Sequence, residues 1–164
     1  MNRYLFVIDY QNDFVDGALG FPGAEKLDEK IAAKVRCYGK GHVLFTRDTH
    51  FENYLDTTEG KHLPVPHCIK GTKGWEIADG LYVEGAKIID KPNFGWPHWN
   101  DETLENVELI GLCTDICVVS NALIIKATFP DAQVKVDSAC CAGVTPESHQ
   151  AALKTMQMCQ VEVV

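Results

Sequence analysis

Short apolar runs alternate along the chain with longer segments whose apolar residues recur at helical spacing. Runs typical of buried strands cover residues 4–8, 42–46, 87–89, 107–110, 133–136 and 161–164. Helical spacing covers residues 25–38, 116–129 and 145–158, and the last begins with a Thr145-Pro146 pair typical of a helix start. This alternation predicts an α/β fold with three layers, α/β/α, around a mostly parallel, doubly wound sheet of about six strands.

Residues 48–81 interrupt the alternation and contain three of the six histidines. Loops of this length in compact domains are usually functional or disordered. The Gly, Pro and Trp residues of this segment favour an ordered loop over a charge-rich disordered one. Because the chain is about one domain long and has no repeat, linker or low-complexity tract, we predict a single domain over residues 1–164.

Composition and charge narrow the class of protein. The chain is 46% hydrophobic and 23% charged, a balance typical of globular proteins. Its formal charge of −8 repels phosphate backbones and anionic membranes, so we expect neither nucleic acid nor a membrane as partner. Seven cysteines, an odd number, follow a first apolar run that does not have the form of a secretory signal. We therefore expect reduced thiols and a cytoplasmic location.

Chemically distinctive residues follow the first four predicted strands, where ligands bind in a doubly wound sheet. They are Asp9, Asp48, His50, Lys91, Cys113 and Cys117. Cys117 lies near a predicted helix start, where the helix dipole and the Lys91 ammonium are expected to favour the nucleophilic thiolate. Asp9 is then a candidate to accept and return a proton, and backbone amides of the turn are candidates to receive an oxyanion. The alternative is that Cys117 is a small buried apolar residue.

A second group of residues has the composition of a metal site. Asp48 and His50 are two residues apart at a strand end, so their side chains can point to the same side. His67 lies further along, with Glu59 and His62 between. Two imidazoles with carboxylates suit Zn²⁺, Fe²⁺ or Mn²⁺, but the spacing matches no single zinc template. A solvated polar pair at Asp48 and His50 is the alternative.

Four motifs carry a resemblance that extends over nearly the whole chain. They are Asp9-Tyr10-Gln11-Asn12-Asp13-Phe14, Thr46-Arg47-Asp48-Thr49-His50, Lys91-Pro92-Asn93-Phe94 and Gly111-Leu112-Cys113-Thr114-Asp115-Ile116-Cys117-Val118. With these motifs in this order, the sequence resembles the isochorismatase-like cysteine hydrolases, and within them the nicotinamidases.

The resemblance implies a role for individual residues. Asp9, Lys91 and Cys117 would form the catalytic triad. A cis peptide bond between Leu112 and Cys113 would direct the backbone amides of Cys113 and Cys117 at the oxyanion. The implied metal ligands are Asp48, His50, Glu59 and His67, with His62 competing with Glu59, and the divalent ion would be zinc, with iron or manganese as alternatives.

The implied activity is hydrolysis of nicotinamide to nicotinate and ammonia through a thioester, as a step of NAD salvage. Another small amide, a ureido compound or a vinyl ether is the alternative substrate within the family. A non-catalytic metal- or redox-binding module is the alternative from another class. Relatives commonly form oligomers, so the resemblance leaves a homo-oligomer as an expected assembly.

The sequence departs from the nicotinamidases in length and near the lysine motif. The chain is short, Phe94 stands where a tyrosine is common, and Gly95-Trp96-Pro97-His98-Trp99 replaces a run of small residues. We expect Phe14, Phe94 and Trp96 to form an aromatic wall for a planar ring. Packing in the core or at a subunit interface is the alternative for Trp96 and Trp99.

Overall fold

Six strands form one sheet in the computed structural model, which describes residues 3–99 and 103–164. They are β1 (Arg3–Ile8), β2 (Val43–Asp48), β3 (Lys87–Lys91), β4 (Asn106–Leu112), β5 (Gln133–Ala142) and β6 (Glu162–Val163). Their order is β3-β2-β1-β4-β5-β6 and every neighbouring pair is parallel. The chain winds from β1 to one edge and then to the other, so the predicted doubly wound sheet is confirmed.

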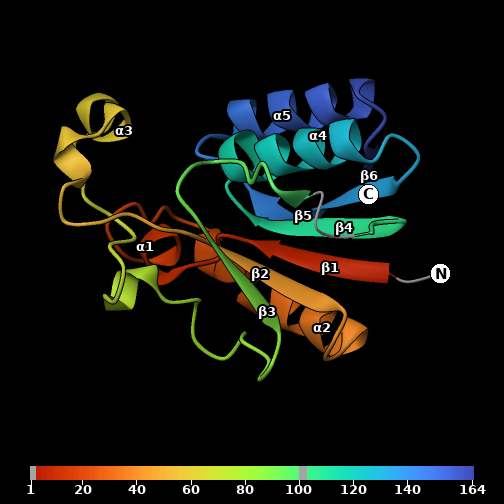
Figure 1. The fold of residues 1–164 in the computed structure, drawn as a ribbon, viewed down its shortest axis with the longest axis horizontal. Coiled ribbons are helices and arrows are strands. Elements are labelled where there is room, and N and C mark those ends of the chain that lie inside the picture. Colours follow the sequence, from red (N-terminus) through yellow and green to blue (C-terminus); the bar gives the residue numbers. More distant parts are fainter. Residues whose placement is uncertain (1–2, 100–102) are drawn as a thin grey trace.

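Helices cover both faces of this sheet (Figure 1). The described helices are α1 (Asn12–Val15), α2 (Asp28–Tyr38), α3 (Thr58–His62), α4 (Val119–Thr128) and α5 (Pro146–Met158). Of these, α2 packs on one face, and α4 and α5 on the other. None of the helices in the described part of the chain is long and apolar enough to span a membrane.

The alternation of side chains along β1 builds two cores, one on each side of the sheet. Leu5 and Val7 point toward α2, whereas Phe6 and Ile8 point toward α4 and α5. The first core includes Ile31, Val35, Val43, Phe45 and Ile110, and the second includes Leu109, Val118, Ala122, Ile125, Leu153 and Met156. The central strands β1, β2 and β4 are buried on both faces along most of their length, which explains their nearly continuous apolar runs.

The element boundaries differ from the predicted ones where the backbone is irregular. β5 continues to Ala142 beyond the predicted end at residue 136, because its pairing with β4 shifts register between Leu109 and Gly111 and then resumes. The helix predicted over residues 116–129 begins with a π-helical turn, Thr114–Val118. In contrast, α5 begins where predicted, because Thr145 and Ser148 form a reciprocal capping box ahead of Pro146.

The segment over residues 48–81 is ordered, as the sequence predicted. It contains α3, two 3-10 turns at Tyr54–Asp56 and Lys73–Trp75, and a β-bridge between His50 and Ile69. α1 and α3 were not predicted, because helices of four or five residues are too short to show apolar periodicity.

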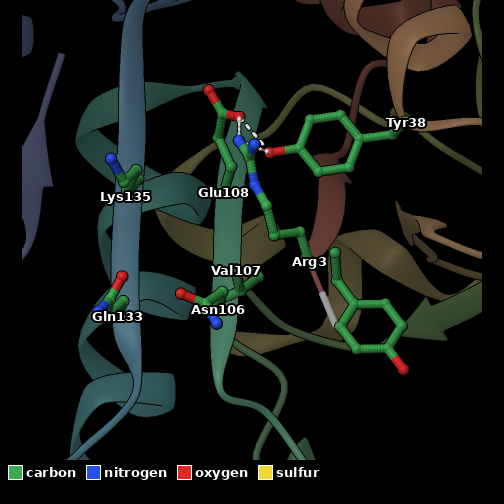
Figure 2. A pocket seen from close by; sticks show the side chains of 8 residues that line it. Arg3, Tyr38, Asn106, Val107, Glu108, Gln133 and Lys135 are labelled. Carbon is green, nitrogen blue, oxygen red and sulfur yellow. Dashed lines mark hydrogen bonds and ion pairs between the residues drawn. The ribbon is translucent and has the colours of Figure 1, made fainter. Parts of the chain in front are cut away.

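A buried carboxylate near the amino ends of the strands ties α2 to the sheet (Figure 2). Glu108 of β4 accepts hydrogen bonds from the Lys34 ammonium and from Tyr38 Oη, the latter at 2.5 Å, and Arg3 lies 4.0 Å away. The Lys34 ammonium also lies 2.7 Å from Asp137 of β5. Helix α2 is therefore held to strands β4 and β5 on the side of the molecule opposite to the carboxyl ends of the strands.

We predict that Glu108→Gln lowers the free energy of unfolding by about 1–3 kcal/mol, because Lys34 and Tyr38 bond to different carboxylate oxygens and glutamine replaces one of these with an NH2 group that cannot accept. Urea denaturation followed by circular dichroism measures the change. An unchanged unfolding midpoint would contradict this account of the network.

Candidate active site

Three buried groups meet where β1, β3 and the turn after β4 end. Lys91 Nζ lies 2.5 Å from Asp9 Oδ2 and 3.7 Å from Cys117 Sγ. The side chains of Asp9 and Lys91 have no exposed surface, and Cys117 is buried beside them. The three residues expected to form a triad are thus in mutual reach, with the ammonium between the carboxylate and the thiol.

The backbone and side chain of Asp9 are both fixed by neighbouring strands. Thr46 of β2 donates to Asp9 Oδ1 at 2.6 Å and accepts from the Asp9 amide at 3.1 Å. Asp9 has a φ of 43°, a left-handed conformation that is uncommon outside glycine and persists when its surroundings enforce it. β1 and β4 also approach closely here, since a side chain at Gly111 would collide with the Ile8 carbonyl.

The protonation of Cys117 differs from the sequence-based expectation. Burial raises the pKa of the Cys117 thiol well above its ordinary value, and the opposing attraction of Lys91 is too small to reverse this. The negative charges of Asp9 and Asp48 raise the pKa further. The expected preference for the thiolate is therefore wrong for the resting site, because a fully buried thiol loses more from desolvation than one ammonium returns.

The two charged partners have pKa shifts that suit a proton carrier and a fixed cation. Burial raises the pKa of Asp9 despite the opposing effects of Lys91 and Thr46, which makes it a stronger base than an ordinary carboxylate. Burial acts to lower the pKa of Lys91, but the attraction of Asp9 and Cys117 outweighs it and raises this pKa. Lys91 consequently stays an ammonium at neutral pH.

The turn that carries Cys117 begins at the Leu112–Cys113 peptide bond, which is cis, as the resemblance implied. The Cys113 carbonyl accepts hydrogen bonds at 3.1 Å from the amides of Ile116 and Val118, so the turn folds back on Cys113. With this π-helical turn, the two residues expected to supply oxyanion amides, Cys113 and Cys117, both line one cavity.

A second group, beside the first, has the geometry of a metal site. Asp48 Oδ2 lies 3.0 Å from His50 Nε2 and 3.4 Å from His67 Nε2. Glu59 Oε1 lies 3.5 Å from His50 Nε2 and 3.6 Å from His67 Nε2. The four ligand atoms all lie within 4.8 Å of one another. His62 is exposed, and its Nδ1 lies 2.8 Å from the Thr58 carbonyl, so Glu59 is the residue that joins this cluster.

The chemistry of these four residues fits a divalent ion. The buried Asp48 Oδ1 has no hydrogen-bond partner among the residues that the structure describes. His67 Nδ1 lies 2.8 Å from the Val65 carbonyl, a hydrogen bond that leaves Nε2 as the ligand atom. Burial lowers the pKa of His50, but Asp48 and Glu59 raise it to about 9. The two carboxylates thus attract positive charge, which a bound proton or a cation supplies.

A cavity of about 50 Å³ separates the thiol from the metal-type cluster. Phe14 and Phe94 line it together with Asp48, Glu59, His67, Cys113 and Cys117. It shares Glu59, Leu63, Phe94 and Ile116 with an outer hollow of about 590 Å³. Trp96 lines neither space, because its side chain packs on the core beside α4 and its ring meets that of His98 at 5.0 Å. The expected aromatic wall is therefore reduced to Phe14 and Phe94.

Asn121 of α4 is a structural determinant of the site that the sequence did not reveal. Its buried amide donates to the carbonyls of Phe94 and Cys117 and accepts from the Trp96 amide and the Trp99 indole. These bonds hold the loop after β3 onto the helix that follows the nucleophile. A buried asparagine within a largely apolar helix was the available signal, but its partners Phe94, Trp96 and Trp99 lie 22 to 27 positions earlier in the sequence.

A doubly wound sheet that brings a buried thiol, a lysine and a carboxylate together beside a metal-type cluster is the arrangement expected of the isochorismatase-like cysteine hydrolases. Residues 3–164 match the model of the isochorismatase domain, and the chain belongs to the isochorismatase family.

Relatives of known sequence agree with this assignment. The chain is 27% identical over 186 residues to a nicotinamidase/pyrazinamidase of Mycobacterium tuberculosis, covering 99% of this chain and 98% of that protein. It is 30% identical over 144 residues to an isochorismatase family protein of Bacillus subtilis, covering 75% of this chain and 78% of the other.

Solved structures are similar over the whole chain. A pyrazinamidase of Pyrococcus horikoshii in complex with zinc has a TM-score of 0.84 at 28% identity. A nicotinamidase of Bacillus subtilis has a TM-score of 0.85 at 26% identity. Each comparison covers 100% of this chain and 99% of the other.

We predict that the zinc affinity of the protein rises with pH. Because the pKa of His50 is about 9, a cation that binds below this pH must displace a proton. The apparent association constant should increase by roughly tenfold per unit between about pH 7 and 9 and then level off.

Calorimetric titration with zinc in buffers of different ionisation enthalpy measures the proton release. A His62→Gln variant should keep the same slope, because His62 lies outside the cluster. An affinity that does not change over this pH range would contradict the assignment of His50.

Proposed function

We propose that the chain is a nicotinamidase, which hydrolyses nicotinamide to nicotinate and ammonia. The observation that carries the proposal is that one small cavity borders both the buried Cys117 and the cluster of Asp48, Glu59 and His67. Such a cavity suits a planar amide with its carbonyl carbon at the thiol and a ring nitrogen at the cluster. The nicotinamidases and pyrazinamidases among the relatives support the same substrate class.

The first half of the reaction acylates Cys117. Asp9 takes the thiol proton, and the resulting thiolate forms a bond to the carboxamide carbon. The backbone amides of Cys113 and Cys117 donate to the oxyanion that develops on the carbonyl oxygen. Asp9 then gives its proton to the amide nitrogen, the carbon–nitrogen bond breaks, and ammonia leaves behind a thioester. The pKa of Asp9, which burial raises above its ordinary value, supports the base role, since the resting thiol must be deprotonated by a neighbour.

The second half releases the acid. Asp9 accepts a proton from water as the oxygen attacks the thioester carbon, and the carbon–sulfur bond breaks. Asp9 returns this proton to the Cys117 sulfur, and the product leaves as nicotinate after its carboxyl group loses its proton to solvent. Throughout both halves Lys91 remains a cation, 2.5 Å from Asp9 Oδ2, and stabilises whichever of the two groups is negative.

The metal ligands in this proposal are Asp48, His50, Glu59 and His67. When bound, a divalent ion supplies a Lewis acid for the lone pair of the ring nitrogen. Phe14 and Phe94 flank the cavity, and the Phe14 ring meets the His67 ring edge-on at 5.6 Å. These contacts orient the ring between the cluster and the thiol.

Further features of the proposal concern the ion and the cell. We propose zinc, which the related Pyrococcus horikoshii structure contains, and a role in NAD salvage. All seven cysteines are free, which supports a reducing, cytoplasmic location. Exposed apolar side chains at Phe51, Leu55 and Leu63 support a homo-oligomer, and light scattering on the purified protein tests it.

We predict that Cys117→Ala abolishes ammonia release from nicotinamide, with a loss of at least about a thousandfold, because the nucleophile is removed. Circular dichroism and zinc content should stay those of the wild type. The matched control is Cys141→Ala, which removes a buried thiol from the same core and should retain turnover. An active Cys117→Ala enzyme would end the proposal.

We also predict that a chelator suppresses ammonia release from nicotinamide and that added zinc restores it. The reason is that two carboxylates and two imidazoles converge on the cavity that would hold the ring. The measurement is an ammonia assay before chelation, after it and after zinc is restored. No release in the zinc-restored enzyme would favour another small amide, a ureido compound or a vinyl ether as substrate.

A further inference from the structure

The fully buried side chain of Gln11 forms hydrogen bonds with both backbone polar groups of Asp48, a residue of the metal-type cluster. Its Oε1 accepts a hydrogen bond from the Asp48 amide at 2.7 Å, and its Nε2 donates to the Asp48 carbonyl at 2.9 Å. The second proton of Nε2 goes to the Trp75 carbonyl at 2.8 Å. A single carboxamide therefore fixes both backbone polar groups of Asp48 and ties them to the segment after α3.

The Asp13 carboxylate holds the backbone directly after His67, a second residue of the cluster. Its Oδ2 accepts from the Cys68 amide at 2.7 Å, and its Oδ1 accepts from the Ala18 amide at 3.1 Å. The Cys68 amide belongs to the peptide that joins it to His67, and Cys68 has a φ of 47°. Gly74 packs against the Asp13 carboxylate so closely that a methyl group there would collide with it. The peptide after His67 is thus held by a carboxylate with little freedom to move.

Both side chains come from the segment that also carries Asp9. The Gln11 amide donates to the Asp9 carbonyl at 2.9 Å, and Phe14 at the end of the same motif packs against the His67 ring. Neither Gln11 nor Asp13 supplies any of the four ligand atoms of the cluster. Their bonds instead determine where the backbones of two ligand residues lie.

We propose that Gln11 and Asp13 are positioning residues for the metal site, acting through the backbones of Asp48 and His67. The inference rests on the proposed metal site. Removing a partner that orients a metal ligand typically weakens metal binding by roughly tenfold to a hundredfold. A merely structural role would lower the stability of the protein without this loss of affinity.

The primary test is Gln11→Met, because methionine is neutral, similar in length and unable to make the three hydrogen bonds. The zinc dissociation constant of the folded protein is measured by competition with a chromophoric chelator. We expect it to rise by roughly tenfold to a hundredfold. The matched control is Glu108→Gln, which disrupts the buried polar network near the amino end of β4 (Figure 2), far from the carboxyl ends of the strands. This variant should bind zinc as the wild type does.

Two further variants test Asp13 independently. The amides of Cys68 and Ala18 bond to different oxygens of the Asp13 carboxylate, and Asp13→Asn replaces one of these oxygens by an NH2 group that cannot accept, so the zinc affinity should fall. Gly74→Ala removes no polar side chain, but its methyl group would displace the Asp13 carboxylate, so it should lower the zinc affinity as Asp13→Asn does. These variants keep the inference testable even if Gln11→Met does not fold.

Unchanged zinc affinity in the folded variants would overturn the inference. An equal loss in Glu108→Gln would do so too, because general destabilisation would then explain the result. A wild-type protein that binds zinc one-to-one but releases no ammonia from nicotinamide would refute the proposed activity and leave the positioning roles testable as described. A wild-type protein that binds no zinc would overturn both.

Discussion

The buried ion pair between Lys91 and Asp9 is the constraint on which the rest of the site depends. Neither charge reaches water, so each requires the other to offset its desolvation. The pair also bridges two strands that are not neighbours, because β2 lies between β1 and β3. Thr46 of β2 fills the gap by bonding to Asp9. The strand order β3-β2-β1 is therefore what allows lysine and aspartate to meet beside a thiol that follows β4.

The group of Asp9, Lys91 and Cys117 and the metal-type cluster are electrostatically coupled as well as adjacent. The Asp48 carboxylate belongs to the cluster, yet its charge raises the pKa values of both Asp9 and Cys117. Lys91 in turn helps to hold the pKa of Asp48 below its ordinary value, although burial acts in the other direction. A change in charge at one group is consequently felt at the other, which suits a site where both face one small cavity.

Much of this arrangement was predictable because ligands bind at the carboxyl ends of parallel strands, and apolar runs reveal where those strands end. Asp9, Asp48 and Lys91 were found in this way. Other features depend on contacts between distant segments: the Trp96 backbone amide donates to Asn121, 25 positions later, and the Gln11 side chain bonds to Asp48, 37 positions later. The direction of the Cys117 pKa shift was missed because position at a helix start says nothing about burial.

The fixed spacing of residues 9, 11 and 13 restricts which changes in the length of this segment the site can tolerate. One segment places the acid–base carboxylate and, two and four residues later, the side chains that hold the backbones of Asp48 and His67. An insertion or deletion of a single residue between Asp9 and Asp13 would separate the acid–base carboxylate from the side chains that hold these two backbones. A change in the length of this one short segment would therefore disturb the hydrolytic group and the metal-type cluster together.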